Sequence, residues 1–213
     1  MDGQAGGVQS IDLDGPVHYV DFAGPGERAT IVLVHGLGGS HLNWELFAPL
    51  LTSRARVLAV DLPGFGLSEP GERPATVPAN VAVLERFIRK VAGGPVVLIG
   101  NSTGGMISVL LASKAPELVR GLVLVDAALP LPLRNAVRRI GAAPFVVVSA
   151  VPGVGESVMR SRRRRFGPRT TVNSLLRLCG VDPRSLPPDL VDRSVLLIDR
   201  RTDVAGTDDA LPS

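Results

Sequence analysis

The stretch Pro95–Met106, with the sequence PVVLIGNSTGGM, decides the fold that we predict for this chain. Val96–Ile99 is a short apolar run between glycines, which is typical of a strand buried on both faces of a parallel sheet. Met106–Ser113 has the pattern of a helix, so Gly100–Gly105 must form a very tight turn from strand to helix. The stretch therefore predicts a strand–turn–helix unit with a polar residue at its tip.

Ser102 lies in this turn as Gly-X-Ser-X-Gly. Side chains at Gly100 and Gly104 would collide with neighbouring backbone, so both positions require a residue without a Cβ atom. The turn lifts the Ser102 hydroxyl above the sheet, and the start of the helix supplies unpaired N–H groups and the positive end of the helix dipole. Acyl transfer needs a hydroxyl beside an anion-stabilising amide, so we predict that Ser102 is a nucleophile.

Two phosphate-binding patterns are the alternatives for this glycine-rich turn. Gly100 and Gly105 have the glycine spacing of a P-loop, but Met106-Ile107 stands where Lys-Ser or Lys-Thr is required. The dinucleotide-binding pattern also fails, because Ser102 occupies its second glycine position. The sequence therefore favours a nucleophile turn.

The chain has 213 residues, of which 45% are hydrophobic, and a mean hydropathy of +0.27. Length and composition therefore indicate one domain with one sizeable core and an additional segment outside it. The longest apolar stretch, Ala142–Val154, contains prolines and is too short to span a bilayer. Residues 1–15 have no signal-peptide pattern. The single cysteine, Cys179, is expected to be a small buried residue and fits a reducing compartment. We therefore expect a cytoplasmic protein without stable membrane insertion.

The charge pattern does not indicate a nucleic-acid partner. The net charge is only +3, and no aromatic residues interleave the arginines as a strand-binding surface requires. The basic run Arg160–Arg165 is interpreted as a solvated face, with recognition of an anionic or membrane-surface substrate as the alternative. The predicted serine chemistry requires no metal and no cofactor, and none is expected.

Apolar runs alternate with helical patterns over the first 125 residues. Besides Val96–Ile99, the predicted strands are Val17–Phe22, Thr30–Val34, Val57–Val60 and Leu122–Val125, and the further predicted helices are Leu42–Leu51 and Val81–Val91. This alternation is typical of an α/β protein with a doubly wound, mostly parallel sheet, whose ligands gather at the carboxyl ends of the strands. Ser102, His35 and Asp61 all fall at that edge.

The pattern changes after Pro130-Leu131-Pro132. We therefore divide the chain into residues 1–130, which hold the sheet, and residues 131–213, which form a helical insertion over the sheet. Ser194–Ile198 in the second part fits a strand or a helix equally well.

An acyl-transfer site needs two N–H donors for the tetrahedral oxygen, and losing one donor slows the reaction about 100–1,000-fold. The N–H of Thr103, directly after the nucleophile, is the first expected donor. The second comes from the loop that follows the strand at Thr30–Val34, where His35-Gly36-Leu37-Gly38 supplies glycines that let the backbone fold under the serine. We therefore expect the N–H of Leu37 to be the second donor.

Three motifs together resemble the α/β-hydrolase family: HGLGGSHLNW at 35–44, DLPGFGLS at 61–68 and GNSTGG at 100–105. They follow the family's order and spacing, and the likeness covers residues 16–130. The resemblance implies that the segment from 131 onward is a cap domain, which closes over the serine and sets substrate choice. The turn and loop are similar to those of serine esterases and lipases and of carbon–carbon bond hydrolases. A serine in the turn, rather than an aspartate, argues against an epoxide hydrolase or a haloalkane dehalogenase.

The chain departs from the family in its histidines. The family order is Ser, then Asp or Glu, then His, but His18, His35 and His41 all precede Ser102. We therefore expect a chain truncated within its cap, without the last strands of the sheet, the base or the acid. His41, near the predicted site, is the alternative base, whereas His35 is expected to hydrogen-bond backbone beneath its loop. His18 is expected to lie far from the site.

Two aspartates at strand ends have structural interpretations. Asp126 follows Leu122–Val125 and is interpreted as a turn-capping carboxylate, with the acid of the triad as the alternative, because some relatives carry that acid after this strand. Asp61 is expected to hold the tight turn at Pro63–Gly66 through its side chain.

The sequence as a whole leads us to expect a serine hydrolase that acts on an ester or similar acyl bond of a small molecule, with base and acid missing from this chain. The alternatives are a catalytically inactive binding or scaffold module of the same fold and a carbon–carbon bond hydrolase. We also expect self-association, because the strand Leu122–Val125 would present an unpaired apolar edge.

Overall fold

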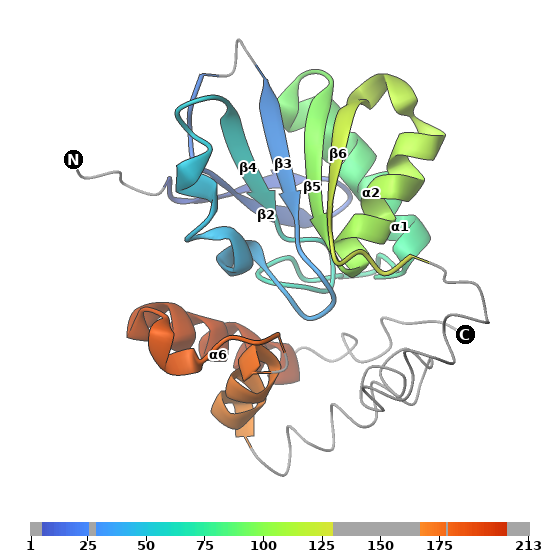
Figure 1. Ribbon diagram of the computed structural model, residues 1–213. Helices are drawn as coiled ribbons and strands as arrows, with labels where there is room; N and C mark the ends of the chain where they lie inside the picture. The colour runs from blue at the N-terminus through green and yellow to red at the C-terminus, as the bar shows by residue number, and fades with distance from the viewer. Residues whose placement is uncertain (1–5, 26–28, 130–166, 178, 204–213) are drawn as a thin grey trace, which may run out of the picture. The chain divides into compact units, whose positions relative to one another are not determined.

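The computed structural model describes residues 6–25, 29–129, 167–177 and 179–203, and the chain divides into two compact units, Met1–Leu129 and Pro130–Ser213 (Figure 1). The first unit contains a six-stranded sheet, and the described part of the second unit is helical. The stretches Ala142–Val154 and Arg160–Arg165, interpreted above from their sequence, lie outside the described residues.

The sheet has the strand order β1-β2-β4-β3-β5-β6. The strands are β1 (Val8–Asp12), β2 (Pro16–Asp21), β3 (Thr30–Val34), β4 (Arg56–Val60), β5 (Val96–Asn101) and β6 (Val119–Val125). The β1–β2 and β2–β4 pairs are antiparallel, and the β4–β3, β3–β5 and β5–β6 pairs are parallel. The predicted α/β architecture with a mostly parallel sheet is therefore confirmed.

β1 is a strand that no pattern in the sequence predicts. Its residues, VQSID, are exposed or half-buried and show no apolar alternation, so no pattern marks them as a strand. The strand forms by pairing with β2, with Asp12 opposite Pro16. The Asp12 carboxylate accepts a hydrogen bond of 2.8 Å from the N–H of Gly15 and so closes the turn between the two strands.

The helical elements of the first unit are α1 (Val77–Phe87), α2 (Thr103–Lys114), the 3₁₀ turns η1 (His41–Trp44), η2 (Ala48–Leu50) and η4 (Pro116–Leu118), and the π-helical turn η3 (Ile88–Ala92). The helix predicted over Leu42–Leu51 is wrong, because this stretch forms η1 and η2 instead. Pro49 has no N–H to donate to the Glu45 carbonyl, and its ring would clash with that carbonyl in an α-helix. α1 begins before the predicted Val81 because Thr76 caps it.

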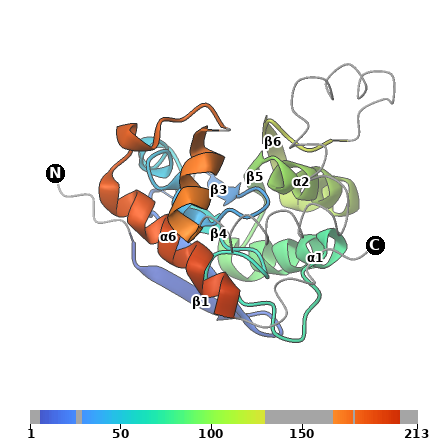
Figure 2. The same cartoon turned by 90° about the horizontal axis from the view of Figure 1, so that it is seen from below.

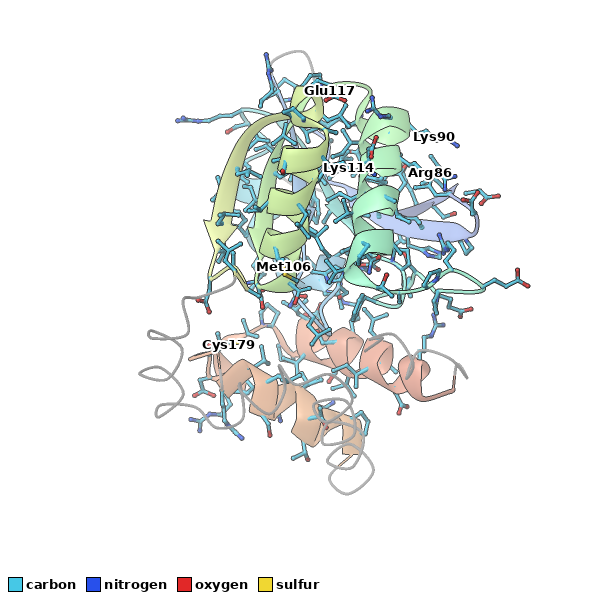
Figure 3. All side chains as sticks on the ribbon, turned by 90° about the vertical axis from the view of Figure 1, so that its right-hand side faces the viewer. Arg86, Lys90, Met106, Lys114, Glu117 and Cys179 are labelled. Carbon is cyan, nitrogen blue, oxygen red and sulfur yellow. The ribbon has the colours of Figure 1, made fainter. Side chains whose placement is uncertain are left out.

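Successive residues of the central strands point to opposite faces of the sheet and build two cores. Val32 and Leu98 pack with residues of α1 and α2 on one face. These two helices lie side by side (Figure 2). Lys114 of α2, labelled in Figure 3, forms an ion pair of 3.1 Å with Glu85 of α1. On the other face, Leu33 packs with residues of η1 and η2. The carboxyl ends of the central strands are therefore held between two packed layers.

The described part of the second unit consists of helical residues 167–177, the 3₁₀ turn η5 (Pro183–Ser185) and α6 (Pro188–Asp203). Ser194–Ile198 lies within α6, so the helical alternative for this stretch is confirmed. Cys179 is exposed in the turn after residues 167–177 (Figure 3), so the expectation that it is buried is wrong. Among the described helices, none combines the length and apolar character that crossing a bilayer requires.

β6 ends the strand order, with β5 as its neighbour within the described sheet. Its apolar side chains Leu122, Val123, Leu124 and Val125 alternate between the two faces and are 37–46% exposed. An exposed apolar strand edge is a template for pairing with another chain.

We expect the purified chain to self-associate through β6, because pairing would bury these side chains on both faces of the sheet. Leu124→Lys should weaken association by at least about tenfold in apparent dissociation constant, since an edge lysine opposes strand pairing. Leu50→Lys is the matched control, because Leu50 is 73% exposed and lies in η2. Size-exclusion chromatography with sedimentation measures the effect, and a wild-type chain that runs as a clean monomer with a sharp thermal transition would contradict it.

Candidate active site

Ser102 lies between β5 and α2, at the carboxyl end of a central strand. Its backbone has φ 49° and ψ −117°, in a region that side-chain-bearing residues seldom adopt. The Ser102 carbonyl accepts the first hydrogen bond of the helix, 3.2 Å from the Met106 nitrogen. The Ser102 hydroxyl makes no capping bond to α2, although serine is a favoured capping residue. The strained turn therefore keeps this hydroxyl away from its own helix.

The glycines around Ser102 are positions where the chain has no room for a side chain. A Cβ atom on Gly104 would lie 2.3 Å from the His35 carbonyl oxygen, and one on Gly100 would lie 2.6 Å from the Gly104 carbonyl oxygen. A Cβ atom on Gly105 would lie 2.6 Å from the Cβ of Ala127. The turn is therefore packed against both the loop after β3 and the segment after β6.

The segment after β6 is hydrogen-bonded to the turn on both sides of Ser102. The Ser102 N–H donates to the Val125 carbonyl at 3.0 Å, and the Ala128 N–H donates to the Ser102 carbonyl at 2.9 Å. The Asn101 side chain donates to the same Val125 carbonyl at 3.1 Å. Asp126 lies within this segment, exposed and with φ 46°, so both interpretations of its carboxylate remain predictions.

The loop after β3 lies beside Ser102. A Cβ atom on Gly36 would lie 3.1 Å from the Cβ of Ser102 and 2.9 Å from the Oδ1 of Asn101. Leu37 follows and is 49% exposed. Among the described residues no hydrogen bond uses the N–H of Leu37, and the N–H of Thr103 opens α2, where backbone donors have no partner within the helix. Both are thus available donors, and their convergence on one oxygen stays a prediction.

His35 uses both ring nitrogens to hold backbone. Its Nδ1 donates to the Gly36 carbonyl at 2.8 Å, so its Nε2 is the acceptor for the Leu62 N–H at 3.1 Å. The ring is buried and makes an edge-to-face contact with Phe65 at 5.5 Å. These bonds match the expected backbone role of His35, and they leave no ring nitrogen for proton transfer.

His41 and Asp61 form a buried pair that the sequence does not predict. The Nδ1 of His41 lies 2.9 Å from Oδ2 of Asp61, and the His41 backbone N–H donates to Oδ1 at 2.6 Å. Burial of Asp61 raises its pKa, but the hydrogen bond and attraction from His41, the attraction from His35 and the hydrogen bond from the Leu67 N–H together outweigh burial, so the pKa of this carboxyl lies below its ordinary value. Asp61 also accepts from the Leu67 N–H at 2.8 Å, which confirms that its side chain holds the turn.

His18 lies on β2, which β4 and β3 separate from β5. Its backbone N–H donates to the Ser68 hydroxyl at 2.7 Å, and its Nδ1 is buried without a partner among the described residues. His18 is therefore three strands from the nucleophile turn, as expected. The described residues contain no group of three or more His, Cys, Asp or Glu side chains that could hold a metal ion.

Comparison with known proteins gives a family match over most of the sheet unit. Residues 29–159 match a family model described as alpha/beta hydrolase fold. The structure is similar to that of Cfl2 from Burkholderia cenocepacia, with a TM-score of 0.70 and 26% identity, over 91% of this chain and 66% of that one.

Three relatives show the range of the similarity. Lipase LipV of Mycobacterium tuberculosis is 35% identical over 113 residues, which are 53% of this chain and 42% of LipV. The sn-1-specific diacylglycerol lipase ABHD11 of Mus musculus is 30% identical over 187 residues, 84% of this chain and 57% of ABHD11. The 2-hydroxymuconate semialdehyde hydrolase of Pseudomonas sp. is 38% identical over 109 residues, 46% of this chain and 36% of that enzyme. The chain thus spans between about a third and three fifths of these relatives.

Gly104→Ala should lower the free energy of unfolding by about 1–3 kcal/mol or more, because the new methyl group would overlap the carbonyl oxygens of His35 and Val34. Gly94→Ala is the matched control, since a Cβ atom there meets nothing within 4 Å, and it should change stability by at most about 1 kcal/mol. Urea unfolding monitored by circular dichroism measures both variants. Equal stability of the two variants would contradict the packing described for the turn.

The stability contributed by Asp61 should be lost in acid. Because its folded pKa lies below the ordinary value of 3.8, the contribution is complete above that value and falls as the pH drops through the folded pKa. Wild type should therefore exceed Asp61→Asn in stability at pH 6, and the difference should shrink as the pH falls below 3.8. Thermal melts of both proteins across this pH range measure the difference in stability. Other carboxylates titrate in both proteins, so their contributions cancel in the difference. A difference independent of pH would contradict the assignment.

Proposed function

Because the chain belongs to the α/β-hydrolase family, we propose that it carries the nucleophile side of a serine hydrolase that cleaves an ester or similar acyl bond. The observation that carries the proposal is the backbone of Ser102, held at φ 49° between β5 and α2 with its hydroxyl released from capping the helix. Strain of this kind persists where the surrounding structure fixes it, and it gathers at functional sites. In a nucleophile turn, backbone strain of this kind exposes the serine oxygen to the substrate.

In the proposed reaction the Ser102 oxygen attacks the carbonyl carbon of the substrate, and its proton passes to a base. The carbonyl oxygen becomes an oxyanion that accepts hydrogen bonds from the N–H groups of Leu37 and Thr103. The bond to the leaving alcohol then breaks, the alcohol takes up a proton, and the acyl group remains on Ser102 until water removes it. This step requires no metal and no cofactor.

We further propose that the three histidines of this sequence do not supply the base. His35 uses both ring nitrogens on backbone, His41 is buried against Asp61, and His18 lies on β2. Without a histidine, a catalytic serine loses about a millionfold in turnover. The 213-residue chain by itself is therefore proposed to hold a formed but unassisted nucleophile.

The second unit is proposed to act as a lid that sets substrate choice, which the family resemblance supports. A small-molecule acyl substrate fits the lipase names of LipV and ABHD11. Cleavage of a carbon–carbon bond is the second candidate, supported by the 38% identity with 2-hydroxymuconate semialdehyde hydrolase. A binding module without catalysis is a third, supported by the engagement of His35 and His41.

Phenylmethanesulfonyl fluoride at millimolar concentration should sulfonylate Ser102 in preference to every other serine, because the oxyanion donors assist attack even where no base does. Peptide mass spectrometry locates the adduct, with Ser102→Ala as the blank. Ser53, exposed on the surface, is the internal control. Modification spread evenly over exposed serines, or absent from Ser102, would contradict the proposal.

In the same preparation, turnover of 4-nitrophenyl butyrate should not differ between wild type and Ser102→Ala, because no base assists Ser102. A clear difference in turnover would show that a base acts within this chain. His41→Ala would then test whether that base is His41, which is buried and paired with the Asp61 carboxylate.

A further inference from the structure

The Asp61 carboxylate is the point at which the loop after β3 meets the turn after β4. Oδ1 accepts from the His41 N–H at 2.6 Å, and Oδ2 accepts from the His41 ring at 2.9 Å and from the Leu67 N–H at 2.8 Å. The Asp61 side chain is fully buried and that of His41 is 8% exposed. Water therefore does not compete for these bonds, and each is stronger than it would be on the surface.

Both ends of the loop after β3 are fixed to one short stretch of chain. At its start, the Nε2 of His35 accepts from the Leu62 N–H at 3.1 Å. At its end, His41 is held twice by Asp61, the residue immediately before Leu62. Leu37, the expected oxyanion donor, lies between these two anchors. The position of its N–H therefore depends on both.

The parts around this network have little room to move. A Cβ atom on Gly66 would lie 2.1 Å from the Asp61 carboxyl, so that carboxyl is packed directly against the backbone of its own turn. A Cβ atom on Gly36 would lie 2.9 Å from Asn101 Oδ1, so the loop also lies close to the nucleophile turn. The close contacts thus lie at both ends of the loop after β3, at Gly36 on the side that faces Ser102 and at the Asp61 carboxyl beside His41.

We propose that His41 is a positioning residue, whose ring bond to Asp61 fixes the loop after β3 and thereby holds the N–H of Leu37 in place beside Ser102. The inference rests on the proposed function, because the position of Leu37 matters to chemistry only if Ser102 is the nucleophile. The role belongs to the side chain, since every residue except proline at position 41 retains the backbone N–H that bonds Oδ1, whereas the bond of residue 41 to Oδ2 needs a side-chain donor.

Two substitutions separate the donor from the bulk of the ring. Asparagine can place an amide N–H near the position of Nδ1, whereas leucine fills similar space without a donor. His41→Asn should therefore behave like wild type, and His41→Leu should not. His41→Ala is a second donor-free variant that avoids any overpacking by leucine. His18→Leu is the matched control, because the Nδ1 of His18 has no partner among the described residues.

The first measurement is hydrogen–deuterium exchange by mass spectrometry on the full chain. Peptides covering 35–44 should exchange about tenfold faster or more in His41→Leu than in wild type, with peptides covering 103–114 unchanged as the reference for an intact fold. His41→Asn and His18→Leu should stay within about threefold of wild type in both regions. Unchanged exchange at 35–44 in both donor-free variants, or an equal rise in both regions, would overturn the proposal.

The second measurement is the rate at which phenylmethanesulfonyl fluoride modifies Ser102. It should fall about tenfold or more in His41→Leu and recover in His41→Asn, since a misplaced oxyanion donor costs up to about 100–1,000-fold. Loss without recovery in His41→Asn would assign His41 a packing role only and overturn the proposal. If the total rate of modification over all residues is no higher in wild type than in Ser102→Ala, the proposed function fails. The hydrogen–deuterium exchange rates alone then decide whether His41 fixes the loop.

Discussion

The tight passage from β5 into α2 is the constraint on which the rest of the site depends. The backbone at Ser102 reverses direction so sharply that φ reaches 49°, and carbonyl groups occupy the space that side chains at Gly100 and Gly104 would need. Backbone strain of this kind costs about 1–3 kcal/mol and persists only where neighbours determine it. Here those neighbours are the carbonyl of Val125 on one side and the loop after β3 on the other.

The strand order explains why these neighbours are present. β5 lies between β3 and β6, all three are parallel, and Val34 and Leu124 both lie opposite Gly100 in the register. The segments that leave β3 and β6 therefore meet at the Ser102 turn. β4 lies on the far side of β3, and its own exit at Asp61 is bonded to His41 in the segment after β3. The sheet thus supports the Ser102 turn from two sides, through the segment after β6 and through the loop after β3, and Asp61 in turn bonds His41 at the end of that loop.

The central strands and the Ser102 turn could be predicted from the sequence, because buried parallel strands and glycine-bounded turns leave strong local patterns. The predicted strand at Thr30–Val34 agrees with β3, and the turn at Gly100–Gly105 lies where the pattern places it. β1 could not be predicted, since its exposed residues VQSID carry no alternation and pair only because β2 is beside them. The helix at Leu42–Leu51 fails because Pro49 outweighs the apolar spacing.

The His41–Asp61 pair shows the limit of local patterns at the site itself. The two residues are 20 positions apart, and only the parallel register of β3 with β4 brings the loop and the turn together. The motifs at 35–44 and 61–68 each suggested a loop, but neither indicates that a carboxylate of one binds the ring of the other. Side chains that bridge two loops depend on tertiary placement, which composition and spacing do not encode.

The most direct test of this account is a crystal structure of the full chain with phenylboronic acid, whose tetrahedral adduct on a serine resembles the transition state of acyl transfer. We predict a bond between boron and Ser102 Oγ, with one boronate oxygen at about 2.7–3.1 Å from the N–H nitrogens of both Leu37 and Thr103. A boronate bound elsewhere, or one attached to Ser102 with both oxygens turned away from Leu37, would contradict it.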